Sequence, residues 1–214
     1  MPLSVFHIEP VTERDVSLTG KELDHAICRA SQQQAATRAR KGRTVKCQPG
    51  AERGRGANSG MDMTWVTDRI AVGGGIWTDD KMIEVVRAGV THIIDMQIEW
   101  DDTKLAEPYG VKVLWNPTDD DFRPKPPELL QRGVDFALTA LEDPDAKVFI
   151  HCAAGVHRAP MMTLAVLRAM GWPLQDAIEV IETQRPVADF AQVYVESVEA
   201  FMKSNEQRAT SYER

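Results

Sequence analysis

Cysteine is scarce in this chain of 214 residues, which contains only Cys28, Cys47 and Cys152. An odd, low count argues against a disulfide framework and suits a reducing compartment, so we expect a cytoplasmic protein with free thiols. No Cys-x-x-Cys pair and no Cys/His cluster has the spacing of a zinc site. The sequence therefore predicts neither a bound metal nor any other cofactor.

Long apolar runs are missing as well. No stretch reaches about 18 apolar residues, which argues against a membrane-spanning helix. Acidic side chains interrupt residues 1–20 early, so this end does not read as a secretory signal. The net charge of −7 disfavours nucleic acid, because phosphate contacts need clustered Lys and Arg. We therefore expect neither a membrane nor a nucleic acid as a partner.

The charge is unevenly distributed, with +4 on residues 1–60 and −11 on residues 61–214. Residues 31–60 are polar and almost free of large apolar side chains, which predicts disorder because little surface can be buried. We expect a disordered or over-extended segment at 1–60, a domain at 61–206 and a tail at 207–214. Either the native start lies at Met61 or Met63, or the upstream region is a genuine flexible tail.

Strand and helix patterns alternate from residue 64 onward. Short apolar runs with β-branched residues predict two strands joined by a turn within 64–74, and further strands at 91–96, 111–116 and 147–151. Helical spacing of apolar residues, with acidic or proline starts, predicts helices at 79–89, 126–143, 159–170, 174–183 and 189–203. This alternation indicates an α/β fold, with a central, mostly parallel sheet and helices on both faces.

The most informative segment is the loop that joins strand 147–151 to the next helix. It starts at the candidate nucleophile Cys152 and continues through Ala153, Ala154, Gly155, Val156, His157 and Arg158. Such a loop points backbone N–H groups at one spot, and the helix dipole adds positive potential there. That field would hold a phosphate and stabilise a thiolate, while the planar fork of Arg158 can bind two phosphate oxygens. The alternative is a buried structural cysteine in an ordinary turn.

The segment His151 to Arg158 resembles the His-Cys-x-x-Gly-x-x-Arg signature of protein tyrosine and dual-specificity phosphatases, and the similarity extends over roughly 64–203. The resemblance implies that Cys152 attacks phosphorus to form a phosphocysteine and that Arg158 holds the phosphoryl oxygens. It also implies that His151 helps to set the acidity of Cys152 through local hydrogen bonds. An upstream aspartate would protonate the leaving oxygen.

Three candidates for that acid lie between a predicted strand and the long helix: Asp119, Asp120 and Asp121. Family members carry the acid about three residues after a proline, and Pro117 then points to Asp120. The neighbouring carboxylates add like-charge repulsion, which tends to keep one carboxyl protonated. The alternative is a solvated acidic turn without a catalytic role.

One residue departs from the family pattern. Ala159 stands where a Ser or Thr usually follows the arginine, and that hydroxyl helps the thiolate to leave. Its absence predicts slow hydrolysis of the phosphoenzyme and keeps open a phosphate-binding pseudophosphatase. Phosphotyrosine and phosphoserine or phosphothreonine in proteins are the first expected substrates, because the loop lacks the lysines typical of phosphoinositide phosphatases. RNA, lipid or sugar phosphates remain alternatives, as does a sulfurtransferase or arsenate reductase.

Overall fold

The structure is a computed structural model, and it describes residues 60–212. The segment 1–60, predicted to be disordered, lies outside the described residues apart from Gly60. Side chains are described up to Gln207. Residues 60–212 form the unit that carries the predicted phosphatase-like domain.

The core of this unit is a five-stranded sheet in the order β1-β2-β5-β3-β4. Only β1 is antiparallel to its neighbour, and the pairs β2–β5, β5–β3 and β3–β4 are parallel. All four residues of the central strand β5 are buried, as expected for a strand covered on both faces. The strand bounds are β1 Met63–Trp65, β2 Ile70–Gly73, β3 His92–Asp95, β4 Lys112–Trp115 and β5 Val148–His151.

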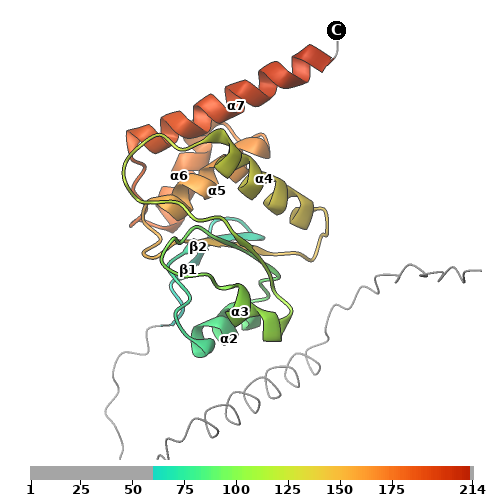
Figure 1. Ribbon diagram of the computed structural model, residues 1–214, viewed down its shortest axis with the longest axis vertical. Helices are drawn as coiled ribbons and strands as arrows, with labels where there is room; N and C mark the ends of the chain where they lie inside the picture. The colour runs from blue at the N-terminus through green and yellow to red at the C-terminus, as the bar shows by residue number, and fades with distance from the viewer. Residues whose placement is uncertain (1–59, 213–214) are drawn as a thin grey trace, which may run out of the picture. The chain divides into compact units, whose positions relative to one another are not determined.

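Helices cover both faces of this sheet, which confirms the predicted fold class. Figure 1 shows α2 and α3 on one face and α4, α5, α6 and α7 on the other. The helix bounds are α2 Asp79–Arg87, α3 Thr103–Ala106, the 3₁₀ helix η1 Glu107–Tyr109, α4 Pro127–Leu141, α5 Arg158–Ala169, α6 Leu174–Gln184 and α7 Gln192–Tyr212. The sequence did not predict α3 and η1, because elements of four and three residues show no helical period.

The predicted start and stop signals act where they were expected in α2. The side chain of Thr78 accepts a hydrogen bond from the Lys81 N–H, and Asp79 and Asp80 lie in the first turn. These contacts satisfy free N–H groups and complement the helix dipole. Gly89, with φ of 85°, follows the end of the helix. At the other end of the unit, α7 runs to Tyr212, beyond residue 206.

The fold places one loop at a special position. The loop Cys152–Arg158 leaves the carboxyl end of β5, the middle strand of the sheet, and leads into α5. The first ten residues of α5, from Arg158 to Leu167, are all buried. The loop is therefore joined at both ends to buried elements, the strand β5 and the first turns of α5. Within residues 60–212, no helix is both long enough and apolar enough to cross a bilayer.

Candidate active site

The loop Cys152–Arg158 folds around the sulfur of its first residue. Cys152 is buried, and the N–H of Gly155 donates a hydrogen bond to its Sγ at 3.2 Å. Gly155 has φ of 65°, where residues with a side chain are strained. A Cβ there would also lie 2.3 Å from the Nη2 of Arg185 and 2.5 Å from the backbone of Gly73. Only glycine permits this turn, which directs a backbone N–H at the sulfur.

Arg158 opens helix α5 and is almost completely buried. Its Nη1 and Nη2 both donate to the carboxylate of Glu99 at 2.9 Å, and Nη1 also donates to the carbonyl of Thr118 at 3.1 Å. Burial acts to lower the pKa of Arg158, but the Glu99 hydrogen bonds and the charges of Cys152 and Asp120 outweigh it and raise that pKa. The guanidinium is thus charged, held in one plane and within the electrostatic reach of Cys152 and Asp120.

A second buried arginine, Arg185, binds backbone carbonyls of the loop. Arg185 donates from Nε to the carbonyl of Gly155 at 2.7 Å and from Nη2 to that of Ala154 at 3.2 Å. It also donates two hydrogen bonds of 2.8 Å to the carboxylate of Asp62 and one of 3.3 Å, from Nη1, to the hydroxyl of Thr64. The hydrogen bond from Arg185 lowers the pKa of Asp62, although partial burial opposes it. Arg185 therefore ties the loop to the segment that precedes β1.

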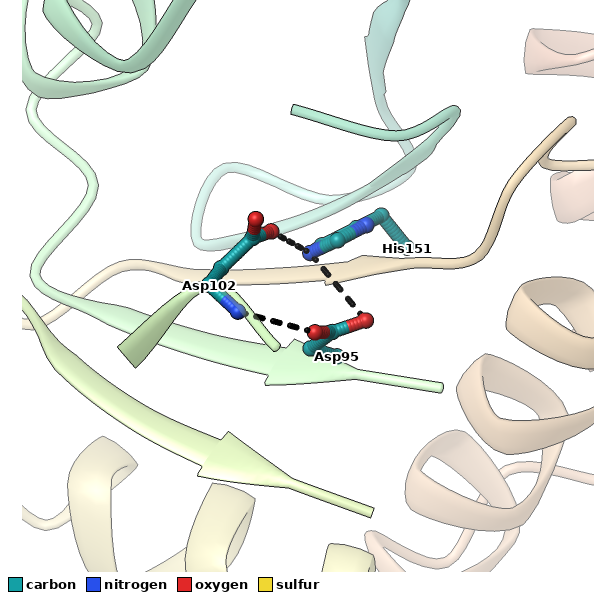
Figure 2. A group of neighbouring side chains, drawn as sticks. All are labelled: Asp95, Asp102 and His151. Carbon is teal, nitrogen blue, oxygen red and sulfur yellow. Dashed lines mark hydrogen bonds and ion pairs between the residues drawn. The ribbon is translucent and has the colours of Figure 1, made fainter. Parts of the chain in front are cut away.

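The side chain of His151 lies with two carboxylates in the interior of the unit, and Figure 2 shows the three side chains pointing toward one another. Its Nε2 is 3.0 Å from Oδ2 of Asp102 and 3.8 Å from Oδ1 of Asp95. All three side chains are fully buried. Burial raises the pKa of Asp95 to about 6, against the lowering effects of His151 and of the backbone N–H of Gln97. Asp95 thus holds its proton to a higher pH than an exposed aspartate does.

These same three residues are the group within residues 60–212 whose ligand atoms lie close enough together to hold a metal ion, all within 4.8 Å. Neither nitrogen of the His151 ring has an aligned hydrogen-bond partner in the described part of the chain. The predicted influence of His151 on Cys152 through hydrogen bonds therefore stays a prediction. The His151 ring faces the carboxylates of Asp95 and Asp102 and stacks on the ring of Phe149, with centroids 5.2 Å apart.

The three candidate acids have different surroundings. Asp120 approaches the loop: its Oδ2 lies 2.9 Å from Nδ1 of His157, and its Oδ1 accepts a hydrogen bond of 3.1 Å from the hydroxyl of Tyr194. Asp121 instead pairs with Lys125 and Arg123, and the Lys125 hydrogen bond lowers the pKa of Asp121. Asp119 is exposed, and its backbone carbonyl accepts a hydrogen bond from Lys125.

Comparison with known sequences gives the family directly. Residues 79–203 match the family described as "Dual specificity phosphatase, catalytic domain", which is more than half of the chain. The chain belongs to the dual specificity phosphatase family. This confirms the resemblance drawn from the segment His151 to Arg158.

Individual relatives of this dual specificity phosphatase are distant. The mouse protein named "Protein tyrosine phosphatase type IVA 2" is 30% identical over 103 residues, which are 48% of this chain and 61% of that protein. Rat "Dual specificity protein phosphatase 26" is 30% identical over 107 residues, 49% of this chain and 51% of that protein. The similarity thus spans between half and two thirds of the length of these relatives.

Solved structures share the fold. The crystal structure of PTPMT1 in complex with PI(5)P superposes with a TM-score of 0.62 at 24% identity, covering 69% of this chain and 99% of that one. Human DUSP28 gives a TM-score of 0.57 at 19% identity, covering 68% and 95%. At these identities the similarity shows the fold alone.

Several residues of the phosphatase site were not found from the sequence. Glu99 and Asp102 lie in the connection after β3, which carries no recognisable motif, and Tyr194 and Asp189 come from the far end of the chain. Arg185 follows the end of α6, 30 positions from Gly155 in sequence. Only Asp95 could have been noticed from the sequence as a site residue, because its carboxyl group directly follows two isoleucines at the end of a strand.

Proposed function

We propose that this dual specificity phosphatase hydrolyses phosphomonoesters through a phosphocysteine on Cys152, with Arg158 as the phosphoryl-binding residue and Asp120 as the general acid. The observation that carries the proposal is the wrapping of the loop around the sulfur, with the Gly155 N–H at 3.2 Å and a buried, charged Arg158 at its end. A structural cysteine in an ordinary turn would not need either feature.

The first step is a displacement at phosphorus. The Cys152 thiolate forms the S–P bond as the P–O bond to the leaving group breaks, and Asp120 transfers its proton to the leaving oxygen. In the second step water attacks phosphorus, the S–P bond breaks, and Asp120 takes the proton of the water. The loop N–H groups and Arg158 stabilise the charge on the phosphoryl oxygens in both steps.

Arg158 keeps a donor for the substrate although Glu99 holds it. Glu99 occupies Nη1 and Nη2, whereas Nε of Arg158 is buried without a hydrogen-bond partner among residues 60–212. A buried N–H without an acceptor is costly, so a phosphoryl oxygen at this position would relieve that cost. The carboxylate of Glu99 thus fixes the guanidinium of Arg158 and leaves its Nε–H available to a phosphoryl oxygen.

We propose phosphorylated tyrosine, serine or threonine in cytoplasmic proteins as the substrate class. The loop offers Ala153, Ala154 and Val156, which are small and neutral and give no extra charge for a polyphosphorylated headgroup. Beside Glu99 runs a groove of about 400 Å³ whose apolar lining includes Ile98, Trp100, Leu105 and Trp115. Such a groove suits the side chains that flank a phosphorylated residue in a peptide.

A phosphate that is not on a protein is the second candidate. The PTPMT1 structure with a similar fold contains PI(5)P, which shows that the fold can accept a lipid headgroup in that protein. Measuring the rate of phosphate release from phosphopeptides and from a phosphoinositide in mixed micelles distinguishes the two substrate classes.

The deciding experiment is rapid mixing with p-nitrophenyl phosphate. We expect a burst of phenolate followed by slow turnover, because Ala159 supplies no hydroxyl to assist release of the thiolate. Ala159→Ser should raise the steady rate without changing the burst. Cys152→Ser should abolish both, by at least about 10⁴-fold. If the wild type releases no phenolate even in the burst, the chain binds phosphate without catalysis, as a pseudophosphatase would.

The acid is tested by comparing aspartates. Asp120→Asn should slow the burst with phenyl phosphate by about 10²- to 10³-fold, because the basic phenoxide leaving group needs the proton. Asp121→Asn is the matched control, since its partner is Lys125, and should change the burst by less than about threefold. Equal losses in the two variants would remove Asp120 from the role of acid.

A further inference from the structure

His157 lies between two carboxylates that come from different parts of the chain. Its Nδ1 is 2.9 Å from Oδ2 of Asp120, and its Nε2 is 3.3 Å from Oδ2 of Asp189. We propose that His157 stores the proton that Asp120 delivers to the leaving group, and that Asp189 fixes the ring in the tautomer this requires. The inference rests on the proposed role of Asp120 as the acid.

Counting protons leads to this assignment. Ionised carboxylates only accept hydrogen bonds, and a neutral imidazole has a single N–H. Both contacts of His157 are therefore satisfied either by an imidazolium between two carboxylates or by a neutral ring that donates to one carboxylate and accepts a hydrogen bond from the other, protonated carboxyl. In each case one proton lies between Nδ1 of His157 and Oδ2 of Asp120, and another lies between Nε2 and Oδ2 of Asp189.

The neighbouring groups hold this geometry. The hydroxyl of Tyr194 accepts a hydrogen bond from the Phe122 N–H at 3.0 Å, so its own proton is donated to Oδ1 of Asp120. Burial raises the pKa of Tyr194, which keeps that proton in place. The Phe122 ring packs edge-on against the His157 ring with centroids 5.0 Å apart. The proton of the pair is thereby confined to the Oδ2 side of Asp120.

The charges that face His157 favour the stored proton. Asp120 approaches from the loop after β4, and Asp189 from the connection between α6 and α7, where its N–H donates to the carbonyl of Val156 at 2.8 Å. Arg158, the next residue in the chain, is paired with Glu99 and also feels the charge of Asp120. On the acid loop, Asp121 is paired with Lys125 and Arg123, so neither of these cations opposes the imidazolium.

The step balances without any further reactant. As the P–O bond breaks, Asp120 gives a proton to the leaving oxygen and receives the Nδ1 proton of His157, which becomes neutral. When water attacks the phosphocysteine, its proton returns to the His157–Asp120 pair. His157 acts through Asp120 and is a positioning and proton-holding residue, not a group that touches the substrate.

The test compares wild type and His157→Asn over about pH 5 to pH 9, using burst rates with two substrates. Asn can still donate a hydrogen bond to Asp120 but cannot hold a proton. With phenyl phosphate, we expect the alkaline limb of His157→Asn to move at least about one pH unit lower, with about tenfold loss at neutral pH. With 2,4-dinitrophenyl phosphate, whose leaving group needs no proton, the two profiles should coincide.

Asp189→Asn provides an independent arm that leaves the loop sequence intact, because the side chain of Asp189 is 68% exposed. It should move the limb in the same direction by a smaller amount, whereas Asp145→Asn, an exposed control in the turn before β5, should not move it. Superimposable phenyl phosphate profiles for wild type, His157→Asn and Asp189→Asn would overturn the inference. Absence of a burst with either substrate in the wild type would instead overturn the proposed function itself.

Discussion

The loop Cys152–Arg158 is supported from two sides that differ in burial. On the buried side the supporting groups are Arg185, His151, Asp95 and Asp102, each nearly or completely inaccessible to solvent. On the solvent-facing side they are Asp120, His157 and Asp189, and the side chains of Asp120 and Asp189 are 32% and 68% exposed. Tyr194, which is itself buried, donates a hydrogen bond to Asp120. Both sides use carboxylates with a histidine or an arginine, yet their environments give them different properties.

This difference in burial gives the two sides different roles: one holds the loop in place, and the other can exchange a proton. Charged hydrogen bonds in a dry environment are costly to break, so the buried side fixes the backbone of Ala154 and Gly155. Exposed ion pairs contribute little to stability because water competes for them. The solvent-facing side can therefore change protonation and position during turnover without loss of the fold. Substitutions on the two sides should consequently affect different measured quantities.

The largest effect on stability should come from Arg185→Met. This change leaves the buried carbonyls of Ala154 and Gly155 without their donor, so we expect the free energy of unfolding to fall by about 2 to 4 kcal/mol. Urea unfolding followed by tryptophan fluorescence measures it. Asp62→Asn removes only the outer partner, whose side chain is 58% exposed, and should cost about 1 kcal/mol or less. Equal costs would show that the carbonyl contacts contribute little.

A smaller effect, visible only as a pH dependence, is expected at Asp95. Its pKa is about 6 in the folded chain against 3.8 as the ordinary value, so folding binds a proton between these limits. The stabilisation from the protonated form is complete below about pH 3.8 and is lost as the pH rises through about 6, up to about 3 kcal/mol in total.

Unfolding free energies at several pH values check this prediction. The wild type should lose stability from about pH 4 to pH 7 relative to Asp95→Asn, which cannot titrate. Parallel curves for the two proteins would show that Asp95 stays ionised and paired with His151 throughout.

The smallest effect should follow Tyr194→Phe, which removes the donor that supports Asp120. Loss of the hydroxyl leaves the Phe122 N–H and Oδ1 of Asp120 without their partner, so we expect about 1 kcal/mol less stability and a burst several-fold slower with phenyl phosphate. Tyr109→Phe is the matched control, because the buried Tyr109 hydroxyl has no hydrogen-bond partner in the described range. That variant should be neutral or slightly more stable.

The fold was largely predictable because its signals are local. Apolar runs with β-branched residues marked the strands, and β3, β4 and β5 lie within the predicted ranges. The helix α5 was predicted to begin at residue 159 and begins at Arg158. Sequence patterns could not find α3, since its four residues are fixed by contacts of Asp102 with β3 rather than by their own periodicity.

The site was predictable only where it is continuous in sequence. Cys152, Gly155 and Arg158 lie within one loop, and their spacing between a predicted strand and a predicted helix indicated a phosphate site. The partners that position them are distant: Glu99 is 59 positions from Arg158, and Tyr194 is 74 positions from Asp120. A local sequence pattern does not show which glutamate or tyrosine will lie beside the loop, because their positions depend on how β3 and α7 pack.

The contact between Arg185 and Asp62 gives the short segment before β1 a part in holding the loop. Asp62 lies between Met61 and Met63, and it accepts both hydrogen bonds of 2.8 Å from the arginine that binds the loop carbonyls. The two residues are 123 positions apart in sequence. A residue that belongs neither to the sheet nor to the loop thus contributes to the shape of the phosphate site, and a change there would reach the site without altering any catalytic side chain.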